Sequence, residues 1–178
     1  MALGEQRAIL QITGFQNSGK TAVMEQLIKK AHNEGYKAGT IKHHGHGGTP
    51  DQIVKEKDSG KHLMAGSKLA GVEGGGVLQL SLGSGSWTLE ELLKIYSMLD
   101  LDLILIEGYK HELYPKAVCI RNEQDLSLLE LNGIVCVIAD KKEMVHTSVP
   151  VFSFHDEEHL YLDFLMKVVK KQYESKSI

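Results

Sequence analysis

The stretch Gly14-Phe15-Gln16-Asn17-Ser18-Gly19-Lys20-Thr21 decides how the rest of the chain is interpreted. It matches the P-loop pattern, which is glycine, four residues, glycine, lysine, and then serine or threonine. Residues 8–13 form a short apolar run that is typical of a buried strand. After Lys20, apolar residues recur at helical spacing until Gly35, where a helix would stop. This order of strand, glycine loop and helix predicts a phosphate-binding site.

The residue types in this stretch suit phosphate chemistry. Two glycines allow the backbone to curl so that successive N–H groups point at phosphate oxygens. The loop opens a helix whose first N–H groups and dipole favour an anion. Lys20 is expected to reach the β- and γ-phosphates, and the Thr21 hydroxyl to bind Mg²⁺. The alternative explanation is a plain glycine turn that joins a strand to a helix.

The composition predicts one soluble domain that covers residues 1–178. The chain is 42% hydrophobic and 24% charged, and its net charge of -3 gives no reason to expect nucleic-acid binding. No apolar run is long enough to span a membrane, and residues 1–7 lack the pattern of a signal peptide, so we expect a cytoplasmic protein. Cys119 and Cys136 lie in apolar runs, which favours buried, reduced thiols over a disulfide.

Strands and helices alternate after the loop. A helix is expected from Thr88 to about Leu99, with Glu91 completing a capping box. Residues 57–67 are expected to be a loop that leads into a short helix, and residues 156–171 a terminal helix. The remaining strands are expected at residues 36–42, 77–82, 102–108, 116–121, 134–139 and 150–152.

This alternation predicts an α/β domain of the P-loop NTPase type, with a mostly parallel sheet flanked by helices. Residues 77–82 are expected to form an alternating or buried strand. Residues 102–108 contain four consecutive apolar positions, which indicates a central strand covered on both faces. Ligands of such sheets gather at the carboxyl ends of the strands. The P-loop, the loop after Lys42, Glu107 and Asp140 all follow strands, so they are expected to share one edge.

Two acids at this edge are candidate ligand contacts. Glu107 closes its strand, where P-loop proteins place an acid that holds Mg²⁺ directly or through water. A solvent-facing acid at a strand end is the alternative. Asp140 can accept hydrogen bonds from the N1–H and amino group of guanine. The usual guanine-reading pattern Asn-Lys-x-Asp is absent, so a plain turn is the alternative and Asp140 alone does not establish guanine preference.

A polar loop after residue 42 offers a different chemistry. Its histidines, with His62 nearby, could bind Zn²⁺ or Ni²⁺, although no cysteine accompanies them. Positive charge around the loop instead favours contact with an anionic ligand. Lys42, Lys57, Lys61 and His62 supply this positive charge. Asp58 is the candidate catalytic acid, and a solvated loop acid is its alternative.

Five blocks of the sequence match one family in order. They are Gly14 to Thr21, Gly39-Thr40-Ile41-Lys42-His43-His44-Gly45-His46, Lys57-Asp58-Ser59 with His62 and Ala65-Gly66-Ser67, Ile106-Glu107-Gly108-Tyr109-Lys110, and Pro115-Lys116 before Arg121. The first block identifies only a superfamily, whereas the second and fourth are much more specific. On these blocks the chain resembles the molybdopterin-guanine dinucleotide biosynthesis protein B family over roughly residues 9–140.

The resemblance implies a GTP-binding protein of molybdenum cofactor biosynthesis that acts as a homodimer and hydrolyses GTP slowly with Mg²⁺. Such proteins assist a nucleotidyltransferase that joins GMP to molybdopterin, so the expected partners are molybdopterin or that transferase. By resemblance, the residues from Gly14 to Thr21 would hold the phosphates of GTP, and Thr21 with Glu107 would bind Mg²⁺. The residues that would face a second ligand or the partner are Lys42, His43, His44, His46, Lys57, Asp58, Lys61 and His62. Ala22 and Asp140 are further candidates for contacts with the nucleotide. Family members often have threonine at position 22 and arginine at position 61. Lys61 keeps the positive charge of arginine but lacks its paired N–H donors, which can bind an anion through two hydrogen bonds.

Two other functions remain open at this point. A small-molecule kinase would use the same P-loop and would need an acid such as Asp58 to take the proton of its acceptor. A nickel-delivery GTPase would use the histidines. No residue stands out as a general base, and the two arginines, Arg7 and Arg121, include no obvious arginine finger. Slow turnover at most is therefore expected, and whether the protein acts as an enzyme stays open.

Overall fold

The computed structural model describes residues 7–43, 58–83 and 86–174. The chain separates into two compact units. The first unit comprises Met1–His43 and Leu93–Ile178, and the second comprises His44–Leu92. The expectation of a single domain stays a prediction.

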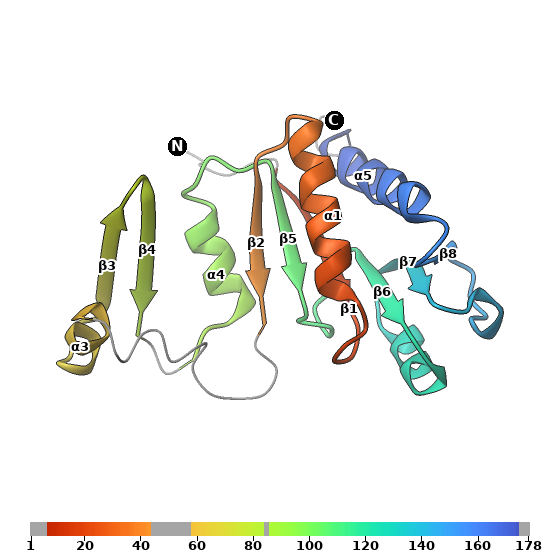
Figure 1. Cartoon of the computed structure of the whole chain (residues 1–178), viewed down its shortest axis with the longest axis horizontal. Coiled ribbons are helices and arrows are strands. Elements are labelled where there is room, and N and C mark those ends of the chain that lie inside the picture. Colours follow the sequence, from red (N-terminus) through yellow and green to blue (C-terminus); the bar gives the residue numbers. More distant parts are fainter. Residues whose placement is uncertain (1–6, 44–57, 84–85, 175–178) are drawn as a thin grey trace. The chain divides into compact units, whose positions relative to one another are not determined.

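The first unit is built on a six-stranded sheet with the order β2-β5-β1-β6-β7-β8 (Figure 1). Every strand pair in it is parallel. The P-loop strand β1 therefore lies in the interior of the sheet, between β5 and β6. The strands are β1 (Ala8–Thr13), β2 (Ala38–Lys42), β5 (Leu103–Glu107), β6 (Lys116–Ile120), β7 (Ile134–Ala139) and β8 (Val151–Ser153).

Both faces of this sheet carry a hydrophobic core. On one face, α1 (Lys20–Asn33) and α5 (Glu158–Glu174) pack against alternate residues of the strands, such as Leu10 and Leu105. On the other face, Val118 and Val137 pack with residues of the 3-10 helix η1 (Glu123–Glu130) and with residues next to the short η2 (Lys142–Met144). All five residues of β5 are buried. The predicted central strand, covered on both faces, is confirmed, as is the predicted α/β architecture.

Most predicted elements of this unit are present with shifted ends. Strand β2 begins at Ala38 rather than residue 36, because the backbone N–H of Lys37 donates to the Asp102 carboxylate instead of to a strand. The terminal helix begins at Glu158. Helix α1 ends at Asn33, two residues before the left-handed Gly35 (φ 85°), as the pattern predicted. The 3-10 helices η1 and η2 were not predicted.

The unit boundary falls within α4 (Leu89–Tyr96), whose predicted capping box is confirmed. The Glu91 N–H donates to the Thr88 hydroxyl at 3.2 Å, and the Thr88 N–H donates to the Glu91 carboxylate at 2.8 Å. The helix ends three residues earlier than expected. Beyond its end, the carbonyls of Leu99 and Leu101 accept hydrogen bonds from the Arg7 side chain.

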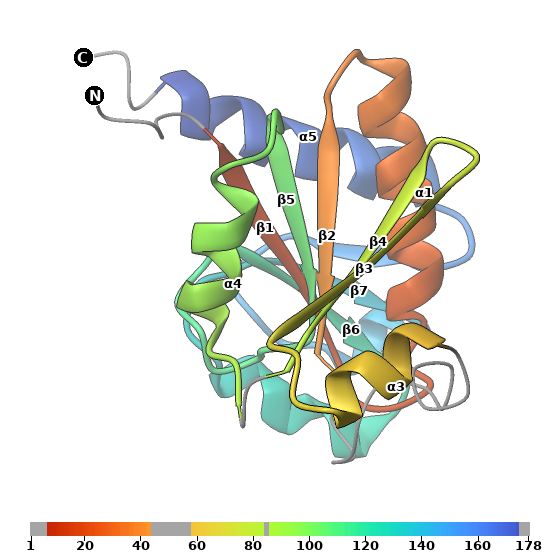
Figure 2. The ribbon, with the colours of Figure 1, turned by 90° about the vertical axis from the view of Figure 1, so that its left-hand side faces the viewer.

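The second unit contains α3 (Asp58–Met64) and an antiparallel hairpin of β3 (Leu69–Gly74) and β4 (Val77–Leu82) (Figure 2). The short helix and β4 were predicted, but β3 was missed. Gly75 and Gly76 have φ angles of 60° and 79°, which suit a two-residue hairpin turn. The strand predicted at residues 77–82 alternates as expected, with Leu78, Leu80 and Leu82 on one face, but it is not buried. Five of the six residues of β4 are exposed.

Both cysteines lie in the sheet core of the first unit. Cys119 on β6 and Cys136 on the neighbouring β7 are fully buried and free, so the prediction of buried thiols is confirmed. Burial raises the pKa of the Cys119 thiol to about 12 and also raises that of Cys136. Among the described residues, no helix combines the length and apolar character that crossing a membrane requires.

Candidate functional site

The P-loop connects β1 to α1, and its two glycines are required by the local geometry. A Cβ atom at residue 14 would collide with the Ser18 hydroxyl and lie 3.0 Å from the Cys119 carbonyl. Gly19 has a φ of 87°, in the left-handed region that glycine adopts without strain. Asn17, with a φ of 59°, is the one non-glycine residue of this loop in that region. The loop is therefore curled as the sequence pattern predicts.

Lys20 bends back over its own loop. Its ammonium group donates to the Phe15 carbonyl and, at 3.3 Å, to the Ser18 hydroxyl. Partial burial lowers the pKa of the Lys20 ammonium, and the Glu107 carboxylate opposes that shift. An anion inside the loop would offer Lys20 a charged partner in place of neutral oxygens.

Thr21, in the first turn of α1, and Glu107, at the end of β5, come together, as predicted. The Thr21 hydroxyl donates to Glu107 Oε2 at 3.5 Å. Glu107 is only 8% exposed, and its other carboxylate oxygen lies 3.3 Å from the Lys42 ammonium. A threonine hydroxyl beside a buried carboxylate supplies the hard oxygen ligands that Mg²⁺ prefers, so these residues fit that ion. Lys42, predicted to face a second ligand, also lies at this site.

The loop after Glu107 is held in place by two polar residues, Gln11 and Lys116, to which no role was assigned from the sequence. Gln11 donates to the carbonyls of Gly108 and Tyr109 at 3.1 and 2.9 Å. The fully buried Lys116 donates to the Lys110 carbonyl at 3.1 Å and to that of Glu112. Burial lowers the pKa of the Lys116 ammonium. Both residues face inward from the start or middle of interior strands, positions that the sequence pattern assigns to apolar side chains.

This loop touches two other predicted parts of the site. The Lys110 ammonium lies 4.6 Å from the centre of the Phe15 ring in the P-loop. The Tyr109 ring lies 4.6 Å from the ring of His43, which follows β2. Tyr109 has a φ of 50°, unusual for a residue with a side chain, and the Gln11 bond to its carbonyl helps to hold it there. The loop thus joins the P-loop side of the site to His43.

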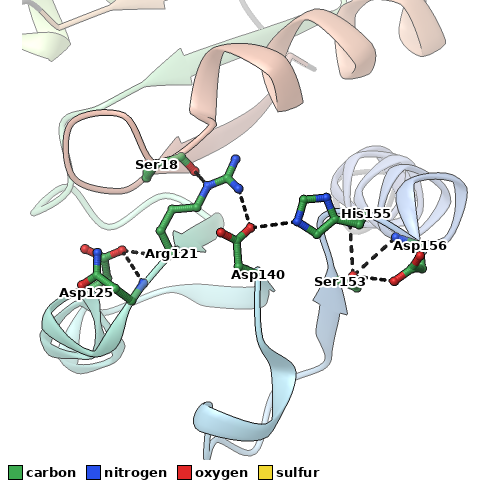
Figure 3. Close-up of polar contacts among 8 residues, drawn as sticks. Ser18, Arg121, Asp125, Asp140, Ser153, His155 and Asp156 are labelled. Atoms are coloured by element: carbon green, nitrogen blue, oxygen red, sulfur yellow. Dashed lines mark hydrogen bonds and ion pairs between the residues drawn. The ribbon is translucent and has the colours of Figure 1, made fainter.

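Asp140 follows β7 and is already engaged by two neighbours (Figure 3). Its carboxylate forms an ion pair with Arg121 and lies 3.3 Å from His155 Nε2. Arg121 follows β6, and its Nε donates to the Ser18 carbonyl of the P-loop at 3.3 Å. The sequence analysis dismissed Arg121 as an arginine finger and gave it no role. Its place as the last residue of the strand predicted at residues 116–121, at the edge where ligands gather, was the signal that could have identified it.

The remaining predicted residues belong to the second unit or lie outside the described residues. In α3, Lys61 forms an ion pair with Asp58 at 2.8 Å, and His62 is next to it in sequence. Their predicted roles toward a ligand or a partner stay predictions. His44, His46 and Lys57 lie outside the described residues. Within residues 7–43, 58–83 and 86–174, no group of three or more histidine, cysteine, aspartate or glutamate side chains is arranged to hold a metal ion.

Comparison with known proteins identifies the family of this chain. The family model described as molybdopterin guanine dinucleotide synthesis protein B matches residues 9–140. The chain belongs to this family. It is 40% identical over 172 residues to a Bacillus subtilis protein named a probable molybdopterin-guanine dinucleotide biosynthesis adapter protein, covering 96% of this chain and 98% of the relative. A Haemophilus influenzae adapter protein of the same pathway name is 33% identical over 77% of this chain and 76% of its own length.

Solved structures of family members share the fold. The crystal structure of Bacillus subtilis MobB is 38% identical, with a TM-score of 0.77 over 90% of this chain and 97% of that one. A MobB homologue from Bacillus stearothermophilus is 37% identical, with a TM-score of 0.74 over 92% of this chain and 98% of that one. The predicted family and the P-loop NTPase fold are therefore confirmed.

Proposed function

We propose that this protein is a GTP-binding adapter of molybdopterin-guanine dinucleotide biosynthesis that acts in the cytoplasm. In this proposal it assists a nucleotidyltransferase that attaches GMP to molybdopterin. The observation that carries the nucleotide part is the curled P-loop with Lys20 folded over it and the Thr21–Glu107 contact of 3.5 Å beside it. The names of its relatives, which are adapters of this pathway, support the biosynthetic part.

Each residue of the site has a distinct task in this proposal. The N–H groups of the P-loop bind the phosphates, and Lys20 moves from its carbonyl partner to a phosphate oxygen. Thr21 and Glu107 hold Mg²⁺, which when bound neutralises charge on the β- and γ-phosphates. Lys42, 3.3 Å from Glu107, adds positive charge on the β2 side. These residues bind and orient the triphosphate.

Turnover is expected to be slow, because the described site lacks a group that would activate water. Glu107 is committed to the Thr21 hydroxyl and the Lys42 ammonium. Arg121 is held by Asp140, which restrains it from acting as an arginine finger. Slow hydrolysis suits an adapter, because the bound state then lasts long enough for a partner to recognise it.

The proposal includes a homodimer, and the hairpin of the second unit supports it. Opposed residues of the hairpin share a face, so Leu69, Leu78, Leu80 and Leu82 lie together on one side. Each of these leucines is between 42% and 62% exposed. A two-stranded sheet is only marginally stable alone, and a patch of this kind marks an interaction surface. A second copy of the chain would cover it with an identical face.

Calorimetric titration with GTP and with ATP, each with Mg²⁺, tests the nucleotide part of the proposal. Clear preference for GTP is the expected result, and addition of the nucleotidyltransferase is then the next step. Preference for ATP would instead favour a small-molecule kinase that uses the same P-loop. If neither nucleotide binds to the homodimer, the proposed GTP-binding function is wrong.

A further inference from the structure

Arg121 is fixed at both ends of its side chain beside the P-loop (Figure 3). Its backbone N–H donates to the Asp125 carboxylate at 2.7 Å, which fixes the point where the side chain begins. Its guanidinium lies 4.1 Å from the centre of the Phe154 ring and forms an ion pair with Asp140. The Arg121 side chain is 32% exposed and that of Asp140 28%. The pair is therefore mostly shielded from water, which strengthens its electrostatic contacts.

The contact with Ser18 gives this arrangement a consequence for phosphate binding. Arg121 Nε donates to the Ser18 carbonyl at 3.3 Å. Because a trans peptide is planar, the Ser18 carbonyl and the Gly19 N–H point in opposite directions. The Gly19 N–H therefore points away from Arg121. A charged donor on the carbonyl also polarises the peptide and makes its N–H a stronger donor.

The close approach of Arg121 depends on the second glycine of the P-loop. A Cβ atom at residue 19 would lie 2.5 Å from Arg121 Nη2 and 3.0 Å from the Phe154 ring. The glycine that permits the left-handed turn thus also leaves room for the guanidinium. The P-loop pattern and the position of Arg121 are therefore coupled through one residue.

We propose that Arg121 is a positioning residue for nucleotide phosphates and that Asp140 acts by holding Arg121 rather than by reading the base. Arg121 fixes the Ser18–Gly19 peptide so that the Gly19 N–H faces the phosphates. His155 contacts the same Asp140 oxygen from the solvent side, since its own side chain is 66% exposed. As far as affinity is concerned, this inference rests on the proposed nucleotide binding.

The experiment compares Arg121→Lys, Asp140→Asn and the double variant with Arg7→Lys as the matched control. Arg7 is the other arginine of the chain, and it binds the Leu99 and Leu101 carbonyls at the start of β1, the end opposite to the P-loop. Affinities for GTP, xanthosine triphosphate and GDP are measured by calorimetry. The Gly19 amide resonance is followed by NMR in the protein without nucleotide, and thermal unfolding checks that each variant is folded.

Both single variants are expected to lose about tenfold in affinity for every nucleotide, as the loss of a charged hydrogen bond implies. The double variant should lose little more nucleotide affinity than the more weakened single variant, because both changes break the same chain of contacts. Arg121→Lys should also shift the Gly19 amide resonance, since lysine keeps the charge but cannot reach Ser18 and Asp140 together. Arg7→Lys should bind nucleotides like the parent.

A base-reading role for Asp140 would give a different pattern and overturn the proposal. Asparagine can donate to the 2-oxo group of xanthine, so Asp140→Asn would then favour xanthosine triphosphate over GTP while Arg121→Lys bound both like the parent. An unchanged Gly19 resonance in Arg121→Lys would also overturn it. If the parent binds no nucleotide, the proposed function fails, and the Gly19 resonance still decides whether Arg121 positions the loop.

Discussion

Two lysines, the half-buried Lys20 and the fully buried Lys116, show how similar contacts serve different purposes. Burial lowers the pKa of both, and both donate to backbone carbonyls. The carbonyls that Lys116 binds belong to one loop, so its charge holds the segment after Glu107 in place. Lys20 instead binds the loop that would surround an anion, so a phosphate oxygen can replace its partner. The first lysine is structural, and the second is poised to bind a ligand.

Replacement of Lys20 by alanine should abolish tight GTP binding. The phosphates would lose their charged partner, and a charge-assisted hydrogen bond is stronger than a neutral one. Calorimetric titration with GTP and Mg²⁺ measures the loss. Lys29→Ala is the control, because Lys29 lies on the same helix with an exposed side chain. Unchanged GTP affinity in Lys20→Ala would show that the P-loop is not the binding site.

Replacement of Glu107 by glutamine should weaken GTP binding with Mg²⁺ more than binding without it. The amide keeps the size of the side chain and can still accept from Thr21, but it loses the negative charge that a divalent cation requires. Titrations with Mg²⁺ and with a chelator separate the two conditions. Equal losses of affinity in both conditions would show that Glu107 does not bind Mg²⁺ and acts only as a partner of Lys42.

At the scale of elements, the β3–β4 hairpin predicts the oligomeric state. Leu80 and Gln79 are neighbours on β4 whose side chains lie on opposite faces. Leu80→Glu should convert the proposed dimer to a monomer, because a charge would be buried in an apolar interface. Gln79→Glu, which adds the same charge to the other face, should leave the dimer intact. Light scattering after gel filtration measures the mass of both variants.

Two outcomes would count against this arrangement. If the parent protein is a monomer at micromolar concentration, a second copy does not cover the hairpin. If both variants are dimers, the interface lies on another surface of the chain. The hairpin itself should survive the changes, since its turn is set by Gly75 and Gly76.

At the scale of the whole molecule, acid unfolding should depend on Glu157. Hydrogen bonds from Lys142 and from the Ser153 N–H hold the pKa of Glu157 below its usual value. A carboxylate with a lowered pKa in the folded state stabilises the protein above its unfolded pKa. That contribution is lost as the pH falls through the folded pKa.

Glu157→Gln should therefore be less stable than the parent at about pH 7 and should approach it at about pH 3. Urea unfolding at several pH values measures the difference. The paired variant Lys142→Met should show the same dependence of stability on pH, because it removes the main cause of the lowered Glu157 pKa. A stability difference that does not change with pH would show that the glutamate acts through packing rather than through its charge.

Local patterns allowed the sequence to predict the first unit well. The P-loop and α1 depend on residues within one or two turns of each other, and β5 has an apolar run that only a covered strand explains. The Thr88 capping box of the second unit is equally local and was also predicted. Strand β3 was missed because Gly71 and Gly74 weaken its pattern and because prediction of a strand usually relies on burial. The leucines of β4 show that an apolar strand need not be buried within its own chain.

Contacts between distant residues were beyond such patterns. Arg121 and Ser18 are 103 positions apart, and only the parallel order of β1 and β6 brings them together. Lys116 could not be identified as buried, because its partners are carbonyls whose direction depends on the loop after β5. The Thr21–Glu107 contact could be predicted because proteins with a P-loop place the threonine after the lysine and a strand-end acid at the same Mg²⁺ site.

The buried cysteines of β6 and β7 also have a kinetic consequence. Thiol reagents attack the thiolate, and a pKa of about 12 leaves almost no thiolate on Cys119 at neutral pH. Modification must therefore wait until the central strands separate and the thiol regains its ordinary acidity. A ligand that binds only the folded unit should slow the modification of Cys119 and Cys136 by the same factor. The rate of thiol labelling thus reports nucleotide binding even when no turnover occurs.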